Sequence, residues 1–370
     1  MASEKLPEHA IILAGGRGTR FWPRSRTRTP KQLLNIIGVD SMLQQTVARL
    51  RPLIPAQRVW TVTNSQQAES VRKHLPAAAR KNILAEPVGR STAAAIALAA
   101  IHIRHAVRGD ALMAVVPADL YIANPPKYLK IARMALNVAR EPGRMVVLGI
   151  PPKRPETGFG YIQCAPKAIL TSPFPVFPVR AFKEKPELRL AKKYVASGDY
   201  QWNAGMFFWR VSTFLDALKK YVPKTSAALE ALASTIGTKN YLRKLGSVYP
   251  RLENIAVDYA ILEAATREHG PTRVFAIPAD IGWSDIGSWT AVHEQSSKSA
   301  THNVLAGAGH MLDAEGNFIW SPSKFAAVIG VRDLVVVETP DALLICPRHR
   351  SQDVGKIVKW LEENQRKDLL

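Results

Sequence analysis

The regular alternation of short apolar runs with helical stretches restricts the fold of this chain more than any other feature of its sequence. The apolar runs, rich in β-branched residues, lie at 9–13, 59–63, 82–85, 111–116 and 145–150. Stretches with helical spacing of apolar residues lie between them at 42–53, 65–75, 91–108 and 126–140. Strands that alternate with helices need crossover connections, so we expect an α/β fold with a mostly parallel sheet flanked by helices. Ligands of such sheets bind beyond the carboxyl ends of the strands.

The second half of the chain departs from this pattern and predicts a separate small unit at the C-terminus. Helical segments recur near 187–197, 211–221 and 257–267, and residues 206–209 have the character of a core strand. From 303 to 346 the helices give way to short β-branched runs with turn residues between them, and 351–364 predicts a closing helix. We therefore predict a catalytic domain at 1–298 and a small β unit with a closing helix at 299–370.

Composition and charge narrow the class of protein. The net charge of +20 would concentrate anions such as nucleoside triphosphates and sugar phosphates around the molecule. The same charge would favour nucleic acid, but the basic residues are dispersed and form no basic tail, so we expect no nucleic-acid partner. The longest apolar stretch, 93–103, is too short to span a bilayer, and the N-terminus lacks the character of a signal peptide. Cys164 and Cys346 have no metal-ligand spacing, and we expect a cytoplasmic protein with no membrane partner.

A glycine-rich segment directly after the first predicted strand carries the strongest chemical signal. Residues 13–23 read Leu-Ala-Gly-Gly-Arg-Gly-Thr-Arg-Phe-Trp-Pro. Gly15, Gly16 and Gly18 leave the backbone uncovered, so its N–H groups can surround a phosphate closely. The segment matches neither a Walker A motif nor a dinucleotide-binding fingerprint, because the required lysine or third glycine is missing at the proper spacing.

Two cations accompany these glycines. Arg20 closes the glycine segment, and Lys31 follows in Pro-Lys-Gln at 30–32. A guanidinium and an ammonium group so close in sequence suit a triphosphate. We predict Arg20 and Lys31 as catalytic residues, and both of them as nucleotide-binding residues together with Gly15, Gly16, Gly18 and Thr19.

The motif resembles the signature of the sugar-phosphate nucleotidylyltransferases, Gly-Gly-x-Gly-Thr-Arg followed by an apolar residue, Trp-Pro and Pro-Lys. The Phe-Trp-Pro at 21–23 favours the mannose-1-phosphate guanylyltransferases (GDP-mannose pyrophosphorylases) within that family. The resemblance continues in order over residues 8–355. It implies a Rossmann-like, mostly parallel mixed sheet and a β-helix-like C-terminal unit, through which such proteins often form dimers or larger assemblies.

The segment after the third predicted strand, Glu86-Pro-Val-Gly-Arg90-Ser-Thr, resembles the family segment that lines the base pocket. A carboxylate can accept hydrogens from N1 and N2 of guanine, which adenine and the pyrimidines do not offer together. We therefore predict that Glu86 and Arg90 bind the nucleotide. Ser91 and Ala94 stand where the family has Asn and Pro. The plain alternative is a helix start, capped by Ser91, beside an exposed Glu86.

Two aspartates are predicted to hold Mg²⁺, a hard cation that prefers oxygen ligands. Asp119 ends the fourth predicted strand in Val-Val-Pro-Ala-Asp, and Asp285 lies in Trp-Ser-Asp-Ile-Gly-Ser-Trp at 283–289. The resemblance implies that the two share the metal, which spacing alone does not show. Leu120 stands where the family has a histidine. A lone aspartate after a strand is more often a turn or cap residue.

The predicted sugar-phosphate residues are scattered along the middle of the chain. Phe-Lys-Glu-Lys-Pro at 182–186, Thr-Gly-Phe-Gly-Tyr at 157–161 and Trp-Asn-Ala-Gly at 202–205 resemble family segments, as does Asp-Tyr-Ala at 258–260. The resemblance implies that the sugar or its phosphate contacts Gly160, Glu184, Lys185, Asn203 and Asp258. In isolation, Lys-Glu-Lys is more often a solvated charge run.

These residues together predict a reaction. The resemblance implies that an oxygen of mannose 1-phosphate attacks the α-phosphorus of GTP, with Mg²⁺ as cofactor, and that GDP-mannose and pyrophosphate are formed. Three alternatives remain: a relative acting on another sugar or base, a regulatory subunit that binds nucleotide sugars without turnover, and a nucleic-acid-binding protein.

Overall fold

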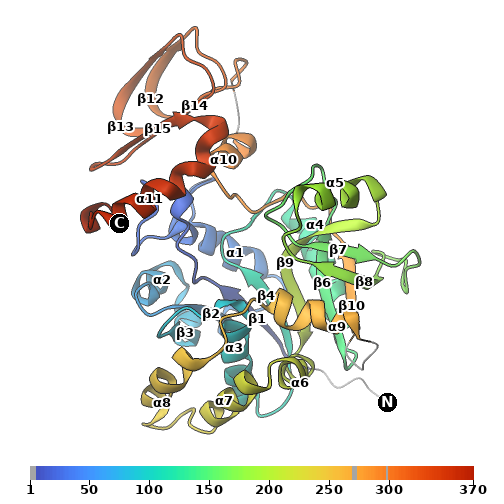
Figure 1. The fold of residues 1–370 in the computed structure, drawn as a ribbon. Helices are drawn as coiled ribbons and strands as arrows, with labels where there is room; N and C mark the ends of the chain where they lie inside the picture. Colours follow the sequence, from blue (N-terminus) through green and yellow to red (C-terminus); the bar gives the residue numbers. More distant parts are fainter. Residues whose placement is uncertain (1–5, 269–272, 297–298) are drawn as a thin grey trace.

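The computed structural model describes residues 6–268, 273–296 and 299–370. Within these residues the largest element is a nine-stranded sheet in the order β3-β2-β1-β4-β9-β6-β10-β8-β7, with a further pairing of β7 to β9 (Figure 1). Its strands are β1 (Glu8–Leu13), β2 (Val59–Asn64), β3 (Ile83–Glu86), β4 (Leu112–Pro117), β6 (Arg144–Ile150), β7 (Tyr161–Cys164), β8 (Phe177–Lys183), β9 (Tyr200–Arg210) and β10 (Arg273–Pro278).

The direction of the strands confirms the predicted mixed α/β sheet. β3, β2, β1 and β4 are parallel neighbours, and β6 is parallel to β10. The buried strand β9 runs antiparallel to both β4 and β6 and joins the two parallel groups. Residues 206–209 are buried in β9, as predicted. Because β9 is antiparallel to β4, the beginning of β9 lies at the carboxyl end of β4.

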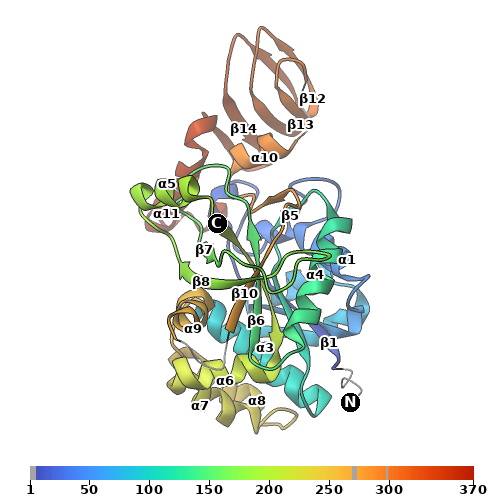
Figure 2. The same ribbon diagram turned by 90° about the vertical axis from the view of Figure 1, so that its right-hand side faces the viewer.

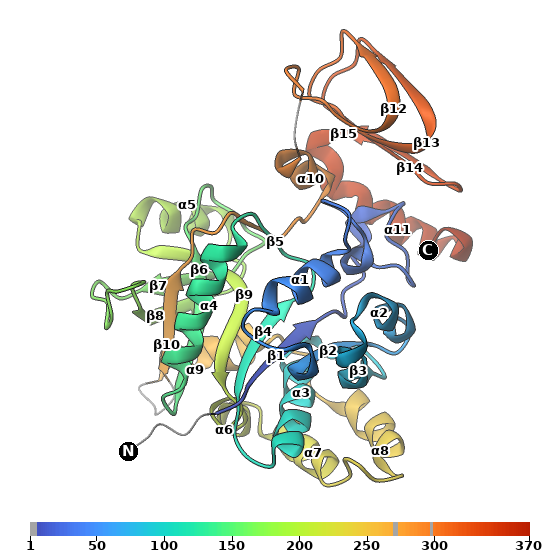
Figure 3. The same ribbon diagram turned by 180° about the vertical axis from the view of Figure 1, so that it is seen from behind.

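Helices cover both faces of the sheet (Figures 1 and 3). One apolar cluster joins a sheet face to α1 (Met42–Leu50) and α4 (Pro125–Ala139). A second cluster joins the other face to α3 (Ser91–Val107), α6 (Val211–Tyr221) and α7 (Pro223–Ala233). Helix α3 is apolar on nearly all sides and deeply buried, as expected for a helix enclosed between a sheet and other helices. None of the described helices is long and apolar enough to cross a membrane.

Shorter elements complete the part of the chain that precedes the C-terminal unit. They are α2 (Ala68–His74), β5 (Tyr121–Ile122), α5 (Leu188–Ser197), α8 (Tyr241–Val248), a π-helical segment (Asp258–Glu263), α9 (Ala264–Arg267), β11 (Trp283–Ser284) and α10 (Trp289–Gln295). The predicted helix at 257–267 is thus a π-helical segment that continues into α9. π-helical segments are rare in proteins overall, but those that occur are often found at functional sites.

The C-terminal unit is β-helix-like, as predicted. It consists of β12 (Val304–Leu312), β13 (Phe318–Ile329), β14 (Leu334–Glu338), β15 (Leu343–Pro347) and the closing helix α11 (Val354–Glu363). β12, β13 and β14 stack in parallel over short corners, and β15 returns antiparallel. Asn317, fully buried at a corner, donates to Asn303 Oδ1 at 3.0 Å and to the carbonyl of Val331 at 2.9 Å. These side chains link successive coils. The predicted boundary at residue 298 lies outside the described residues.

The C-terminal unit packs directly against the glycine-rich segment (Figures 1 and 2). A third apolar cluster contains Phe21 and Trp22 from that segment, Trp289 of α10, and Val358 of α11. Trp22 Nε1 also donates to the carbonyl of Leu369 at 3.0 Å. The segment after β1 is therefore held from two sides, by the sheet and by the C-terminal unit.

Candidate active site

The glycine-rich segment leaves the carboxyl end of β1 in a conformation that depends on glycine. Gly18 has a φ of 62°, and a Cβ there would overlap Lys31 Cβ. Gly16 has no heavy atom within 4 Å of the position of a Cβ, so its backbone is open to a ligand. The buried Gln32 fixes the segment, because its Nε2 donates to the carbonyls of Ala14 at 2.8 Å and Gly16 at 3.0 Å. The sequence alone does not indicate this role for Gln32.

A cavity of about 300 Å³ adjoins this segment, and Gly15, Gly16, Glu86 and Arg90 line it. Glu86 is buried, which excludes the alternative of an exposed carboxylate. Its Oε1 accepts a hydrogen bond of 2.6 Å from the hydroxyl of Tyr249. Burial raises the pKa of Glu86, and the bond from Tyr249 partly opposes that rise. Its other oxygen lies 3.4 Å from the position of a Cβ on Gly15, so the carboxyl group faces the glycines.

The interpretation of Ser91 as a helix cap is wrong. Arg90 is the N-cap residue of α3, and no side chain caps the helix there. Ser91 is itself the first helical residue, one position beyond the N-cap, and has a φ of 59°. A positive φ in a non-glycine residue is uncommon. Ser91 is also one of the residues that line the cavity.

The two predicted metal ligands lie close to Lys31. Lys31 is buried, and its Nζ donates to Asp119 Oδ2 at 2.9 Å and to the carbonyl of Asp285 at 2.6 Å. Burial raises the pKa of the Asp285 carboxyl, Lys31 and Arg20 lower it, and the charge of Asp119 raises it further. The sequence predicts that Lys31 reaches toward a triphosphate. Its ammonium group instead contacts the two aspartates.

Arg20 lies between the catalytic part and the C-terminal unit. Its Nη1 donates to Gln352 Oε1 at 2.8 Å, and the same nitrogen is 3.4 Å from the position of a Cβ on Gly287. That Cβ would also lie 2.8 Å from Asp285 Oδ2, so the absence of a side chain at Gly287 allows the carboxylate and the guanidinium to approach. The hydroxyl of the neighbouring Thr19 points toward α11 rather than toward the cavity. It lies 3.8 Å from the position that a Cβ on Gly355 would occupy.

The aspartate pair fits Mg²⁺ only if other oxygens complete its coordination. No group of three or more potential His, Cys, Asp or Glu ligands occurs among the residues that the structure describes. Asp119 and Asp285 are nevertheless close enough for the charge of one to raise the pKa of the other. Mg²⁺ is commonly held by one or two carboxylates, with waters and substrate phosphates as its other ligands. Two coupled carboxylates beside the predicted phosphate-binding segment match that donor set.

Leu120 contributes to the core rather than to the site. The side chain is buried in the apolar cluster that packs α1 and α4 against the sheet. A histidine at this position would place an imidazole among apolar neighbours, where an unpaired polar group is costly. The departure from the family pattern is therefore compatible with the packing around it.

The predicted sugar-phosphate residues come together around Asn203 at the beginning of β9. Its backbone N–H donates to the carbonyl of Gly160 at 2.8 Å, and its Nδ2 donates to Asp258 Oδ1 at 2.8 Å. A Cβ on Gly160 would overlap Glu184 Oε2, so only glycine fits against that carboxylate. Lys185 Nζ lies 3.9 Å from Glu184 Oε1. These five residues, from four separate segments, form one cluster.

Glu184 is the polar group of this cluster that most clearly lacks a partner. Its Oε2 is buried and has no hydrogen-bond partner among the residues that the structure describes. Burial, and to a lesser degree the charge of Asp258, raise the pKa of Glu184 to about 7, although Lys185 opposes the rise. An unsatisfied buried carboxyl oxygen is costly unless a ligand donates to it. Sugar hydroxyls could supply such a donor.

The raised pKa predicts a pH-dependent stability. Between about pH 4.5 and pH 7 the unfolded chain releases the Glu184 proton while the folded chain retains it, so stability falls as pH rises through this range. The loss would amount to up to about 3 kcal/mol. In E184Q this titration is absent, so its free energy of unfolding should rise relative to wild type until pH 7 and then level off. Denaturant unfolding at several pH values measures the difference, with the exposed E187Q as control. Parallel curves for E184Q and wild type would contradict the assignment.

Comparison with known protein families divides the chain into two matched parts. Residues 9–302 match the family model described as nucleotidyl transferase. Residues 310–361 match the model of the MannoseP isomerase/GMP-like beta-helix domain. The first match contains all the predicted site residues, whereas Gln352, the partner of Arg20, lies in the second.

Individual relatives match nearly the whole chain. A mannose-1-phosphate guanylyltransferase of Klebsiella pneumoniae is 39% identical over 97% of this chain and 74% of its own length. The alginate biosynthesis protein AlgA of Pseudomonas aeruginosa is 37% identical over 97% of this chain and 73% of its own length. A solved structure from Thermus thermophilus, described as a mannose-1-phosphate geranyltransferase, superposes with a TM-score of 0.84 at 32% identity. It covers 96% of this chain and all of that one.

Proposed function

Because the chain belongs to the mannose-1-phosphate guanylyltransferase family of nucleotidyltransferases, we propose that it transfers the guanylyl group of GTP to mannose 1-phosphate and releases pyrophosphate. This proposal rests on where the glycine-rich segment, Asp119 and the cluster around Asn203 lie relative to one another in the sheet. The glycine-rich segment follows β1, Asp119 follows β4, and Asn203 begins β9, and these strands are neighbours in the sheet. Asp119 therefore lies between the glycine-rich segment, which we propose binds phosphates, and the cluster around Asn203, which we propose binds sugar hydroxyls.

The proposed reaction requires charge neutralisation more than proton transfer. The attacking phosphate oxygen of the sugar is already ionised at neutral pH, so no strong general base is needed, and alignment with the α-phosphorus lowers the barrier. In this proposal Arg20 stabilises the departing pyrophosphate, and Lys185 holds the sugar phosphate against repulsion by GTP. Lys31 keeps the two aspartates in place. The nucleotidyltransferase family generally uses a divalent metal, and Mg²⁺ held by Asp119 and Asp285 would neutralise phosphate charge.

The proposal also assigns the selection of substrates. Glu86 would accept hydrogens from guanine, with Tyr249 orienting its carboxyl group. Glu184 and Asn203 would bind the sugar hydroxyls, since one has a free buried oxygen and the other both donors and acceptors. Specificity of this kind depends on buried polar groups, which remain unpaired when a wrong substrate binds.

Pyrophosphate release tests this proposal directly. GTP, UTP, dTTP and ATP are each supplied with mannose 1-phosphate or glucose 1-phosphate, in the presence of Mg²⁺. Rapid release with GTP and mannose 1-phosphate alone is the expected result. Release with another pair would refute the assigned specificity but keep the chemistry. If folded protein bound nucleotide without releasing pyrophosphate from any pair, a regulatory binding subunit would be the better interpretation.

We further propose that the C-terminal β unit mediates self-association into a homodimer or larger assembly. Phe325 and Ile329 of β13 are 69% and 67% exposed, and Leu312, which is paired with Ile329 in the register of β12 and β13, is 50% exposed. Large apolar side chains that are exposed next to one another are typical of an interaction surface. F325E should therefore shift the protein toward monomer in sedimentation experiments. V39E, at an exposed apolar position in the catalytic part, is the matched control and should leave the assembly unchanged. An identical mass for wild type and F325E would contradict an interface at this surface.

A further inference from the structure

Two helices begin next to each other between the cavity beside the glycine-rich segment and the sugar-phosphate cluster. Helix α3 has Arg90 as its N-cap residue, and the π-helical segment that begins at Asp258 has Val257. Neither helix has a side-chain cap of its own. The first four N–H groups of a helix have no partner within it, so both of these helix starts need acceptors from elsewhere in the chain.

Each helix start supplies an acceptor to the other. The backbone N–H of Ala93 in α3 donates to the carbonyl of Ile255, just before the π-helical segment, at 3.3 Å. The backbone N–H of the buried Val257 donates in turn to the hydroxyl oxygen of Thr92 at 2.9 Å. A buried N–H group without an acceptor is costly, so the Thr92 hydroxyl holds the start of the π-helical segment in place.

The anchored residue directly precedes a member of the sugar-phosphate cluster. Asp258 follows Val257, and its Oδ1 accepts a hydrogen bond of 2.8 Å from Asn203 Nδ2. Its charge also raises the pKa of Glu184. Because the two residues are adjacent in the helix, a displacement of Val257 would displace the Asp258 carboxylate with it. The hydroxyl of Thr92 therefore contributes to the geometry of this cluster without touching it.

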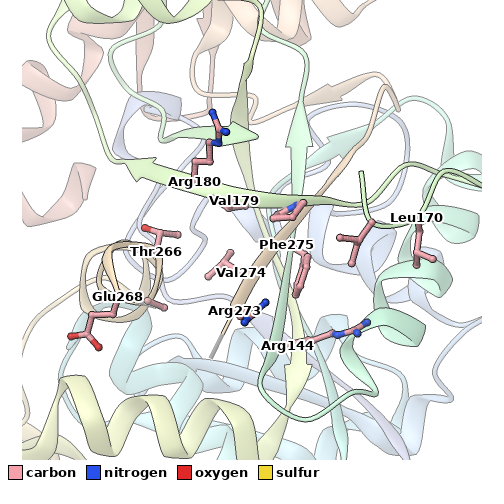
Figure 4. A pocket seen from close by; sticks show the side chains of 12 residues that line it. Arg144, Leu170, Val179, Arg180, Thr266, Glu268, Arg273, Val274 and Phe275 are labelled. Carbon is pink, nitrogen blue, oxygen red and sulfur yellow. The ribbon is translucent and has the colours of Figure 1, made fainter. Parts of the chain in front are cut away.

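The far end of the same helical stretch has fewer packing contacts on one side. Helix α9 continues from the π-helical segment, and this end borders a cavity of about 760 Å³ that Ala265, Thr266 and Glu268 help to line (Figure 4). A cavity along a helix removes contacts that would otherwise fix its position. The placement of the stretch therefore depends more strongly on the hydrogen bonds at its start.

We propose that Thr92 is a positioning residue for mannose 1-phosphate, which acts through Val257 to hold Asp258 in the sugar-phosphate cluster. This inference rests on the proposed function, in which the cluster around Asn203 binds the sugar. Thr92 lines the cavity together with Glu86, so its location alone would assign it to GTP. Its hydrogen bond to the Val257 N–H connects it to the other substrate instead.

Steady-state kinetics of T92V test this role. Valine has nearly the shape of threonine but offers no acceptor to the Val257 N–H. T92V should raise the KM for mannose 1-phosphate by about tenfold, the scale of leaving one buried donor unpaired, and should leave the KM for GTP unchanged. T92S keeps the hydroxyl and should resemble wild type in both values. An unchanged KM for mannose 1-phosphate in T92V, an equal rise in the KM for GTP, or a T92S variant that behaves like T92V would overturn the proposal.

T213V is the matched control for the loss of a threonine hydroxyl. The buried Thr213 of α6 accepts a hydrogen bond of 3.1 Å from the backbone N–H of Gly143, which precedes β6, whereas Asn203 pairs near the other end of β6. T213V should lose a similar hydrogen bond and still keep the wild-type KM for mannose 1-phosphate. A rise as large as in T92V would show that general destabilisation is the cause, and would overturn the proposal.

A double variant tests whether Thr92 acts through Asp258. If it does, the effects of T92V and D258N on the KM for mannose 1-phosphate do not add, and T92V/D258N should match D258N. Fully additive effects would contradict the proposed route.

Hydrogen exchange tests the anchor without reference to catalysis. The backbone amides of 255–262 should exchange faster in T92V than in wild type, T92S and T213V, because the opening of this helix start becomes less costly. T92A allows the same comparison if T92V does not fold. Equal exchange in wild type and the variant without the hydroxyl would overturn the proposal. If wild type does not turn over mannose 1-phosphate at all, the proposed function fails, while exchange still decides whether Thr92 anchors Val257.

Discussion

R20A is expected to lower kcat by about 10² or more, which is the scale of losing one preorganised donor to a developing charge. The Arg20 guanidinium lies between Asp285 and the side-chain oxygen of Gln352, and these two groups hold it in position. Pre-organisation of this kind means that the positive charge needs no rearrangement when pyrophosphate departs. Initial rates of pyrophosphate release at saturating substrates measure the effect.

R17A and Q352A test whether the effect of R20A comes from the loss of the Arg20 charge or from a change in where that charge lies. Arg17, in the same segment, forms an exposed ion pair with Glu362, and surface pairs contribute little, so R17A should stay close to wild type. Q352A keeps the guanidinium but removes its partner, and should lower kcat by an intermediate amount. Near-normal turnover in R20A would refute its assigned role. A loss in R17A as large as in R20A would show that the segment as a whole, not this guanidinium, is sensitive.

The second large effect is expected for D285N, which should raise the Mg²⁺ concentration needed for half-maximal activity by about tenfold or more. The substitution preserves shape but removes one negative charge from two coupled carboxylates. Mg²⁺ depends on such hard, charged oxygen ligands. Titration of activity with Mg²⁺ at fixed nucleotide concentration measures the shift.

The control for this prediction lies nearby. Asp280 is an exposed aspartate five residues earlier, paired at 3.7 Å with Lys127, and D280N removes the same charge away from the site. Its Mg²⁺ titration should match that of wild type. An unchanged titration in D285N would exclude Asp285 from the metal site. An equal shift in both variants would indicate a general effect of net charge instead.

The sequence predicted the parts of the site that follow directly from strand order. Gly15 and Asp119 lie next to strand ends, and parallel strands bring their carboxyl ends to one edge of the sheet, so the placement of both could be inferred. The direction of β9 could not be inferred, because an apolar run such as that at 206–209 forms a central strand equally well in either direction.

The residues that hydrogen-bond to the site residues could not be predicted from the sequence. Tyr249 contacts Glu86 across 163 positions of sequence, and Gln352 contacts Arg20 across 332. Such contacts follow from tertiary packing, and neither residue lies in a segment with a chemical pattern of its own. The burial of Lys31 was equally unforeseen, since a lysine is almost always exposed unless it is paired.

The contact between the glycine-rich segment and the C-terminal unit has a consequence for how proteins of this kind can diverge. Phe21 and Trp22 share one apolar cluster with Val358, and the backbone N–H of Thr27 donates to the carbonyl of Leu370 at 3.0 Å. A β unit taken from a relative would have to carry complementary side chains for this segment. The two units should therefore be inherited and exchanged as a matched pair, and chimaeras joined near residue 298 should fold well only when both sides of the contact come from the same parent.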